Sequence, residues 1–318
     1  MALVLTVNSA QWNRHVNALA ATIDGLVPVV KGNGYGFSRD WLAEKASKLA
    51  PVMAVGTVHE VPSVPSNYTA VVLTPALDVP SELRHDAVLT IGSTTHIDAA
   101  VRSNGRTPRQ VLVKIRSSMN RYGVPADEAN TLIQLCNSRG LQVVGVSIHP
   151  PLVGTSQDHA SEITSLLSTI SDAMPAWVSH ISPSDFSILQ NQQSQRSWFL
   201  RLGTSLWHGD KSALKLTADV LDVVAVKKGQ IVGYHGATIP DDGKMLMIGC
   251  GSAHGVTPLS DGRSPFHFSQ QRLHLIEAPH MHTSLCFVPH GAPTPVIGDD
   301  VDVQRPLIST LVDRINWV

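Results

Sequence analysis

Residues 29–36 read VVKGNGYG and place a lysine between an apolar run and a glycine-rich turn. The apolar run from Leu26 to Val30 is short, rich in β-branched residues and bounded by glycine, which predicts a buried strand. Lys31 then ends a core strand, where an unpaired ammonium group is costly to bury. In one interpretation its ammonium group simply reaches solvent. In the other it is a desolvated amine that forms a Schiff base with a carbonyl cofactor, and the glycines favour this because they let the backbone approach a ligand closely.

The composition is that of a folded globular chain. The sequence has 318 residues, of which 43% are hydrophobic and 15% charged, and its net charge is -1. This balance gives no sign of nucleic acid or a membrane surface as a partner, and no apolar run approaches the length of a membrane span. The start of the chain lacks the basic region and cleavage site of a signal peptide. The cysteines are few and scattered, which indicates a reducing, cytoplasmic setting.

The first two thirds of the chain alternate strand-like and helix-like segments. We expect eight parallel strands joined by crossovers, which is the pattern of a (β/α)8 barrel of the TIM type; a doubly wound sheet is the alternative. The predicted strands are 27–31, 52–57, 69–74, 87–92, 110–116, 143–149, 177–182 and 197–203. The predicted helices are 9–24, 39–49, 94–103, 126–139, 157–173 and 184–192, with less certain helices after the second and third strands, where the connections are short and rich in proline.

The pattern changes after residue 214. Strand-like runs at 217–226, 230–234, 244–249, 272–277 and 284–289 follow one another with turns and without a long helix, which predicts an antiparallel β-domain. We therefore expect an α/β chain with a barrel over residues 8–214 and a C-terminal β-domain over 215–318. The N-terminal strand 1–7 is expected to join the β-domain.

The stretch VVKGNGYGF (29–37) resembles the VVKANAYGHG signature of alanine racemases, which use pyridoxal 5′-phosphate (PLP) and combine a barrel with a β-domain. The resemblance covers essentially the whole chain, most strongly at the lysine motif and at 201–209. It implies that Lys31 is the aldimine lysine and that Tyr35 contacts the phosphate. PLP is therefore the expected cofactor, and no metal site is expected because no C-x-x-C pair is present.

Further motifs follow at the carboxyl ends of the predicted strands, where barrels carry their chemistry. Residues 114–123, KIRSSMNRYG, resemble the family's K-x-D-T-G-M-N-R-x-G stretch, and Arg121 matches an arginine near the cofactor and the substrate carboxylate. His149 matches a histidine that stacks on the pyridine ring. Ser182 matches a serine that binds phosphate. Taken alone, the arginine, the histidine and the serine would be read as ordinary loop or core residues.

The eighth strand ends in RLGTSLWHG (201–209), which resembles the family's R-P-G-I-x-L-Y-G. The resemblance assigns Arg201 to the pyridine nitrogen and the backbone amides of Gly203 and Thr204 to the phosphate. An arginine does not readily give up a proton, so the pyridine nitrogen stays unprotonated. The ring is then a weaker electron sink, which favours reprotonation at Cα and thus racemisation over transamination.

The β-domain departs from the family. Racemisation needs proton transfer on both faces of Cα, and the family supplies the second base from a tyrosine in a G-Y-A-D-G motif of the partner subunit. Here the matching stretch is IGCGSAHG (248–255), with Cys250 at the tyrosine position. In one interpretation Cys250 is the second base, its pKa lowered by imidazole groups such as His280 or His282. In the others it is an inert buried cysteine, or His254 or His282 serves the second face.

The remaining expectations follow from the same resemblance. Met281 is expected to present its backbone N–H to the substrate carboxylate across a homodimer with shared active sites. The family's closing R-V-P-R-x-Y becomes RINWV (314–318), so one phosphate-contacting tyrosine is missing. The expected function is racemisation of a small amino acid, alanine by default, which supplies D-amino acids for cell wall biosynthesis. The alternatives are a PLP-binding protein with lost catalysis, or a decarboxylase or lyase.

Overall fold

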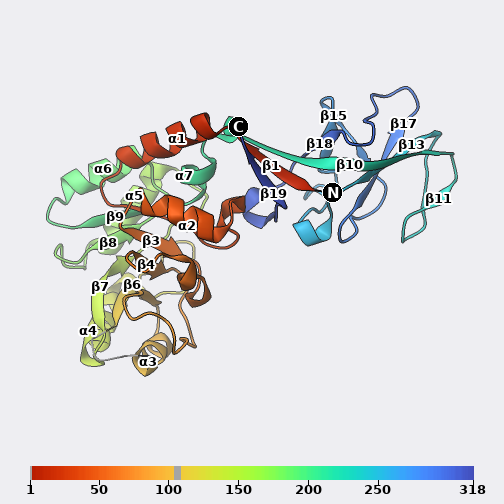
Figure 1. Ribbon diagram of the computed structural model, residues 1–318. Coiled ribbons are helices and arrows are strands. Elements are labelled where there is room, and N and C mark those ends of the chain that lie inside the picture. The colour runs from red at the N-terminus through yellow and green to blue at the C-terminus, as the bar shows by residue number, and fades with distance from the viewer. Residues whose placement is uncertain (1, 104–108) are drawn as a thin grey trace. The chain divides into compact units, whose positions relative to one another are not determined.

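The computed structural model describes residues 2–103 and 109–318 (Figure 1). Met1, which was included in the predicted N-terminal strand, lies outside these residues. The chain forms two compact units. The barrel unit comprises His15–Gly34 and Ser38–Gly209. The β-unit comprises Met1–Arg14, Tyr35–Phe37 and Asp210–Val318.

Eight parallel strands build the barrel unit. A six-stranded sheet in the order β2-β9-β8-β7-β6-β5 is joined to the pair β3-β4 by parallel bridges between Val29 and Ala54 and between Val71 and Val88, which close the ring. The strands are β2 (Leu26–Pro28), β3 (Val52–Val55), β4 (Thr69–Val72), β5 (Leu89–Ile91), β6 (Gln110–Lys114), β7 (Gln142–Ser147), β8 (Ala176–Val178) and β9 (Trp198–Leu202). The predicted (β/α)8 barrel is confirmed, and each observed strand overlaps a predicted one.

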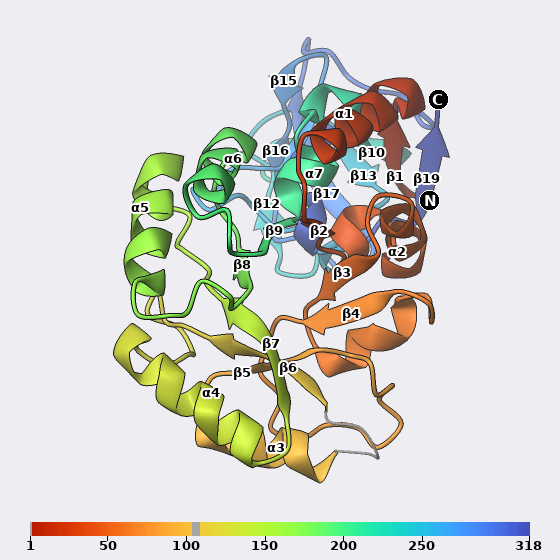
Figure 2. The ribbon, with the colours of Figure 1, turned by 90° about the vertical axis from the view of Figure 1, so that its left-hand side faces the viewer.

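Helices form the outer layer of the barrel, as Figure 2 shows for α3 to α6. The α-helices of the chain are α1 (Ser9–Ala21), α2 (Arg39–Ser47), α3 (Thr94–Arg102), α4 (Ala129–Ser138), α5 (Ser156–Leu167), α6 (Pro183–Gln192) and α7 (Thr204–His208). The connection from β3 to β4 contains only the 3-10 segment η2 (Val58–Ser63), which includes Pro62. Proline lacks the N–H that a longer helix would need, which explains the short connection.

The sequence sets the helix starts in this layer. Thr155 and Asp158 form a reciprocal capping box that begins α5. Ser182 caps α6, and Pro183 follows it at the first helical position, where a missing N–H costs nothing. The strands that these helices cover are apolar on both faces, as in other parallel sheets, so the strand ends are held in fixed positions at one edge of the barrel.

One buried arginine, which lies just before β9, is hydrogen bonded to the loop between α5 and β8. The Arg196 side chain, 1% exposed, donates to the carbonyl oxygens of Ile170 (3.1 Å), Ser171 (3.1 Å) and Met174 (2.7 Å) and pairs with Asp172. Arg196→Met leaves the buried carbonyl of Ile170 and the part-buried carbonyls of Ser171 and Met174 without these donors, so we expect a loss of about 2 kcal/mol in the free energy of unfolding. Urea denaturation measures it.

The matched control is Arg139→Met. Arg139 pairs with Asp98 on the surface, where both side chains are nearly half exposed (45% and 49%). Surface ion pairs of this kind contribute about 0–1 kcal/mol. Equal losses in the two variants would contradict the structural role assigned to Arg196.

The β-unit is a mainly antiparallel assembly. Its larger sheet contains β1 (Leu3–Val7), β10 (Leu214–Val226), β13 (Gly243–Ile248), β14 (Phe266–Phe268), β15 (Gln271–Arg272), β16 (His274–Leu275), β17 (Ser284–Pro289), β18 (Asp300–Val303) and β19 (Arg314–Trp317). The N-terminal β1 pairs antiparallel with β10 and parallel with β19. A separate hairpin joins β11 (Ile231–Val232) and β12 (Ala237–Thr238). The sequence patterns missed β12, β14, β18 and β19, which are too short to show alternation.

Candidate functional site

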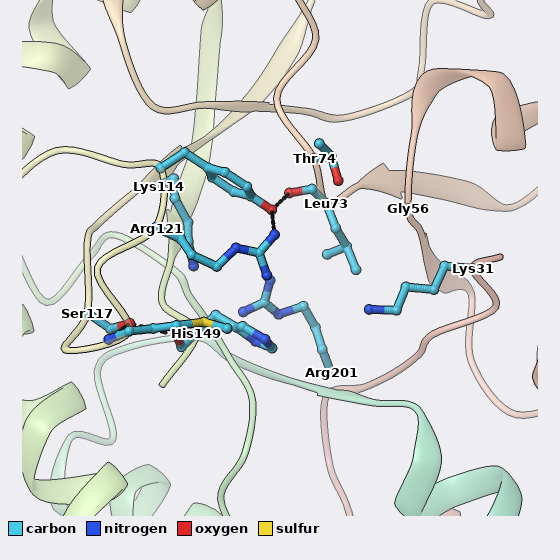
Figure 3. Close-up of a pocket in the computed structure, with 11 residues that line it drawn as sticks. Lys31, Gly56, Leu73, Thr74, Lys114, Ser117, Arg121, His149 and Arg201 are labelled. Carbon is cyan, nitrogen blue, oxygen red and sulfur yellow. Dashed lines mark hydrogen bonds between the residues drawn. The ribbon is translucent and has the colours of Figure 1, made fainter. Parts of the chain in front are cut away.

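A cavity opens at the carboxyl ends of the barrel strands. Its empty volume, part of which is open to solvent, is about 580 Å³. Figure 3 shows the guanidinium groups of Arg121 and Arg201 close together in its middle, with the amine of Lys31 pointing toward them. The lining residues come from six strand ends and are Lys31, Gly56, Leu73, Thr74, Lys114, Ser117, Met119, Arg121, Tyr122, His149 and Arg201.

Lys31 enters the cavity just beyond β2. Gly56 gives it room, because a Cβ at that position would lie 3.3 Å from the Lys31 Cβ. Burial lowers the pKa of Lys31 below its usual value of 10.5, and the charges of Arg121 and Arg201 lower it further, against an opposing effect of Glu60. Glu60 is held in place by the N–H groups of Gly32 and Gly56. A larger share of Lys31 is therefore the neutral, nucleophilic amine near neutral pH.

Arg201 is the most firmly held cation of the site. It lies on β9 and is 7% exposed. Its guanidinium donates to the Ser147 hydroxyl (3.0 Å), to the Ile148 carbonyl (2.5 Å) and, at 3.4 Å, to the Val178 carbonyl. Burial lowers its pKa to about 10, so it remains a cation at neutral pH. These bonds fix the orientation of the guanidinium group and therefore the direction in which its other N–H groups point.

A buried lysine, Lys114, ends β6. It is 7% exposed, and its Nζ has no hydrogen-bond partner in the described structure. Burial lowers its pKa well below the usual value, and the charges of Arg201 and Arg121 lower it further. A buried amine without a partner is costly, so an anionic or acceptor group in the cavity would relieve that cost.

A short loop after β6 carries Arg121. The chain folds back so that Val124 donates its N–H to the Lys114 carbonyl (3.0 Å), and the backbone N–H of Arg116 donates to the Val124 carbonyl. Gly123, with φ +125°, is required there because a Cβ would lie 2.8 Å from the Lys114 carbonyl oxygen. Arg121 itself donates to the Tyr122 hydroxyl at 3.1 Å. The loop thus presents an arginine and a phenol to the same cavity.

His149 closes another side of the cavity just beyond β7. Its Nδ1 is hydrogen bonded to the Ser179 hydroxyl, and its ring lies 4.3 Å from the ring of His180. Burial lowers the pKa of His149 to about 2, helped by the charge of Arg201. The imidazole is therefore neutral at any ordinary pH and offers a flat, uncharged face. Such a face suits stacking on an aromatic ring better than proton transfer.

The charge of Arg121 has a measurable consequence for Lys31. Arg121→Met removes a cation that disfavours the charged form of Lys31, so the pKa of Lys31 rises toward its usual value. We expect the acid limb of imine formation between Lys31 and PLP, followed by absorbance, to shift to higher pH. Arg121→Lys keeps the charge and should leave the limb in place. A shift to lower pH in Arg121→Met would contradict the assignment.

The lining residues fit the cofactor that the resemblance implies. Four of them are cationic groups, Lys31, Lys114, Arg121 and Arg201, and no carboxylate lies among the lining residues of the described chain. PLP is a small aromatic polyanion, so it would neutralise this cluster, and its acceptor atoms would supply partners for Lys114. Neutral His149 would face its ring. Within the described residues, no cluster of three or more His, Cys, Asp or Glu could hold a metal ion.

Three other predicted barrel-site residues lie outside the set that lines this cavity. Ser182 donates its hydroxyl to the Asp185 carboxylate (2.7 Å) while it caps α6, so binding phosphate would require that bond to be given up. Gly203 and Thr204 lie where β9 passes into α7. The first N–H groups of a helix have no partners within the helix and can bind an anion. The phosphate role of Gly203 and Thr204 remains a prediction.

The other predicted site residues belong to the β-unit. Tyr35 is buried, with its backbone in the left-handed region at φ +56°. Met281 is 66% exposed. Trp317 stacks against Phe37 and meets Trp12 edge-on, so it belongs to an aromatic cluster of this unit. The roles of Tyr35 and Met281 remain predictions.

The expectation for Cys250 needs correction. Its side chain is 0% exposed, and a second subunit could only bury it further. Burial raises the pKa of Cys250 to about 12, and the charges of Asp313 and Asp219 also raise it. A thiol base needs the opposite shift. The structure therefore favours the interpretation of Cys250 as an inert buried cysteine.

The motif match itself also has a better register. GSAHG (251–255) matches G-Y-A-D-G at three of five positions, with Ser252 at the tyrosine position. The structure explains both outer glycines, because a Cβ on Gly251 would lie 2.0 Å from the His280 carbonyl oxygen and Gly255 has φ +74°. Between them Ser252 begins the 3-10 turn η5 (Ser252–His254) and is exposed.

Sequence reasoning assigned no role to several cavity residues. Lys114 carried a signal, because a lysine at the end of an apolar strand raises the same question as Lys31. Thr74 and Tyr122, which line the cavity, and Glu60, which lies beside Lys31 without lining it, carried none, since their positions depend on loop conformations that only the structure shows.

Comparisons with known proteins identify the family of the chain. Residues 7–210 match the family model for the N-terminal domain of alanine racemase. The alanine racemase of Mannheimia succiniciproducens is 22% identical over 271 residues, which cover 79% of this chain and 75% of that protein. The alanine racemase of Laribacter hongkongensis is 24% identical over 190 residues, and this chain spans half of its length (50%).

Solved structures share the fold. Alanine racemase from Bartonella henselae, a structure with covalently bound pyridoxal phosphate, aligns over 100% of both chains with a TM-score of 0.74 and 15% identity. The biosynthetic alanine racemase of Pseudomonas aeruginosa aligns over 100% of this chain and 99% of its own, with a TM-score of 0.72 and 17% identity. No helix in residues 2–103 and 109–318 is both long and apolar enough to cross a membrane.

Proposed function

Because residues 7–210 match the N-terminal domain of alanine racemase, the chain belongs to the alanine racemase family, and we propose that it is a PLP-dependent racemase of a small amino acid, alanine by default. The observation that carries the proposal is the cavity at the barrel strand ends. It joins an amine of lowered pKa, two arginines and a neutral imidazole around a space without a carboxylate. PLP is the cofactor, and when bound it acidifies the α-proton of an attached amino acid by withdrawing electrons from Cα.

Lys31 has two tasks in this proposal. Its Nζ holds PLP covalently in the resting enzyme, and after release it takes or returns a proton on one face of Cα. Both tasks need a neutral amine for part of the cycle. Burial and the charges of Arg121 and Arg201 favour that form by lowering the pKa of Lys31.

The two arginines and the histidine orient the reactants. Arg121 faces the cavity from a loop and would bind the substrate carboxylate with a charge-assisted hydrogen bond. Arg201 is fixed by its bonds to Ser147 and Ile148 and would donate to the pyridine nitrogen without transferring a proton. His149 would pack on the ring. This arrangement limits electron withdrawal and favours return of the proton to Cα over transamination.

The working unit is proposed to be a homodimer with shared sites, since racemisation needs a second proton-transfer group on the face opposite Lys31. The second candidate function is a PLP-binding protein without catalysis. The observation that favours it is Ser252, which stands at the tyrosine position and is a weak base.

Proton NMR in heavy water separates the two. The purified protein with PLP is incubated with L-alanine, and the α-proton signal and the appearance of D-alanine are followed. The proposal expects loss of the signal together with D-alanine. Exchange without inversion would show a competent base on one face only. Absence of exchange with every amino acid tested would contradict the racemase proposal and favour the non-catalytic candidate.

A further inference from the structure

The guanidinium group of Arg121 rests on one neighbouring side chain. It donates to the Tyr122 hydroxyl at 3.1 Å, and its Cζ atom lies 4.8 Å from the centre of the Tyr122 ring. Within residues 2–103 and 109–318, the structure gives the Arg121 side chain no other hydrogen bond or ion pair. Arg201, by contrast, is held by backbone and hydroxyl acceptors of the barrel. The orientation of the Arg121 guanidinium therefore depends on Tyr122.

The Tyr122 hydroxyl connects this arginine to the end of a barrel strand. As an acceptor it binds Arg121, and as a donor it makes a long bond of 3.5 Å to the Leu73 carbonyl (Figure 3). Leu73 directly follows β4, and its own N–H donates to the carbonyl of Val55 in β3 at 2.9 Å. Because the Leu73 backbone is paired with a neighbouring strand, the hydroxyl joins a loop side chain to a fixed part of the barrel.

The backbone of the loop is held separately, by residues at which KIRSSMNRYG (114–123) departs from the family stretch. Arg116 donates from Nε and Nη2 to the Gly123 carbonyl at 3.1 and 2.8 Å. The Ser118 N–H and hydroxyl donate to the carboxylate of Glu162 in α5 at 2.5 and 3.1 Å. With the backbone held in this way, the freedom left to Arg121 is that of a long side chain with several rotatable bonds, and this is the freedom that Tyr122 restricts.

We propose that Tyr122 is the positioning residue of the substrate carboxylate site, because its hydroxyl and ring hold the Arg121 guanidinium in the cavity with its other N–H groups open to the carboxylate of an amino acid. The proposal rests on the proposed racemase function, in which Arg121 binds that carboxylate. Tyr122 itself transfers no proton. An arginine that is ordered before the substrate arrives loses less side-chain entropy on binding, so Tyr122 contributes to affinity for the substrate and not to the chemical step.

Propionate, which is alanine without its amine, measures this site in the PLP-loaded protein without any reaction. Tyr122→Phe removes the hydroxyl and keeps the ring, and we expect the dissociation constant of propionate in isothermal titration calorimetry to rise about fivefold. Tyr122→Leu removes the ring as well, which should raise the constant by about a further threefold. Tyr68→Phe makes the same change at a tyrosine that does not line the cavity, and it should bind propionate like the unchanged protein.

A double mutant distinguishes positioning from a merely structural role. If Tyr122 acts through Arg121, the variant with both Arg121→Met and Tyr122→Phe binds propionate as weakly as Arg121→Met alone. Losses that multiply in the double mutant would show that Tyr122 acts independently of Arg121 and would overturn the proposal. An unchanged dissociation constant in Tyr122→Phe would also overturn it, and so would an unchanged protein that does not bind propionate.

Steady-state kinetics give a second readout. Loss of binding that is shared by substrate and transition state raises KM and leaves kcat unchanged, so we expect the KM of Tyr122→Phe for alanine to rise about fivefold with kcat within about twofold of wild type. A fall in kcat at constant KM would overturn the proposal.

The two proposals fail in different ways. A racemising wild type whose Tyr122→Phe variant shows unchanged KM and unchanged propionate binding refutes the role of Tyr122 alone. A wild type that exchanges no α-proton with any amino acid refutes the racemase function, and the propionate titrations then decide whether Tyr122 positions Arg121.

Discussion

Lys31→Ala should abolish both the absorbance of lysine-bound PLP and turnover. Burial and two arginines lower the pKa of Lys31, as they do that of Lys114, but of these two lysines only Lys31 lies beside the glycine-rich turn. Loss of a proton-transfer group alone costs about 10²–10⁴-fold in rate, and loss of the covalent anchor adds to it. We therefore expect turnover to fall by at least about 10³-fold.

The comparison that makes this result specific is Lys48→Ala. Lys48 is exposed at the end of α2 and should have neither effect when replaced. Circular dichroism of both variants checks that the fold is retained. An unchanged spectrum of the PLP-loaded Lys31→Ala protein would refute the role of Lys31.

Arg201→Met has the second largest expected effect. The substitution leaves the Ile148 carbonyl and the Ser147 hydroxyl without their buried donor, so we expect the free energy of unfolding to fall by about 1–3 kcal/mol. It also removes the donor proposed for the pyridine nitrogen, and we expect turnover to fall by about 10²–10³-fold, as for other fixed electrostatic donors. Finally, it removes a charge that lowers the pKa of Lys31, so the acid limb of the activity profile should move to higher pH.

Arg201→Lys separates these effects. A lysine keeps the positive charge but loses the planar fork of donors. We expect turnover to stay low while the acid limb stays near its original pH. If Arg201→Lys restored full turnover, the charge alone would be sufficient, and the directed hydrogen bond proposed for Arg201 would be wrong.

The barrel could be predicted from sequence because its strands are continuous apolar runs with helical periodicity between them. Lys31 could be found for the same reason, since it follows such a run, whereas Arg201 was assigned only from the resemblance of 201–209 to a family motif. The cavity loops could not be predicted. The position of Arg121 depends on the left-handed backbone of Asn120 and on Gly123, and a linear pattern does not show how such a loop folds back.

The β-unit was harder to predict because its strands are short and its site residues lie in turns. Cys250 was chosen from the order of residues, but burial alone decides whether a thiol can react.

Peptide mapping after reduction tests most directly whether Lys31 carries PLP in the cavity. The purified protein is loaded with PLP, reduced with borohydride, digested and analysed by mass spectrometry. We expect one pyridoxyl-phosphate group per chain on the peptide that contains Lys31, and none on that peptide in Lys31→Ala. Stoichiometric labelling of Lys114 or another lysine, with Lys31 unmodified, would contradict it.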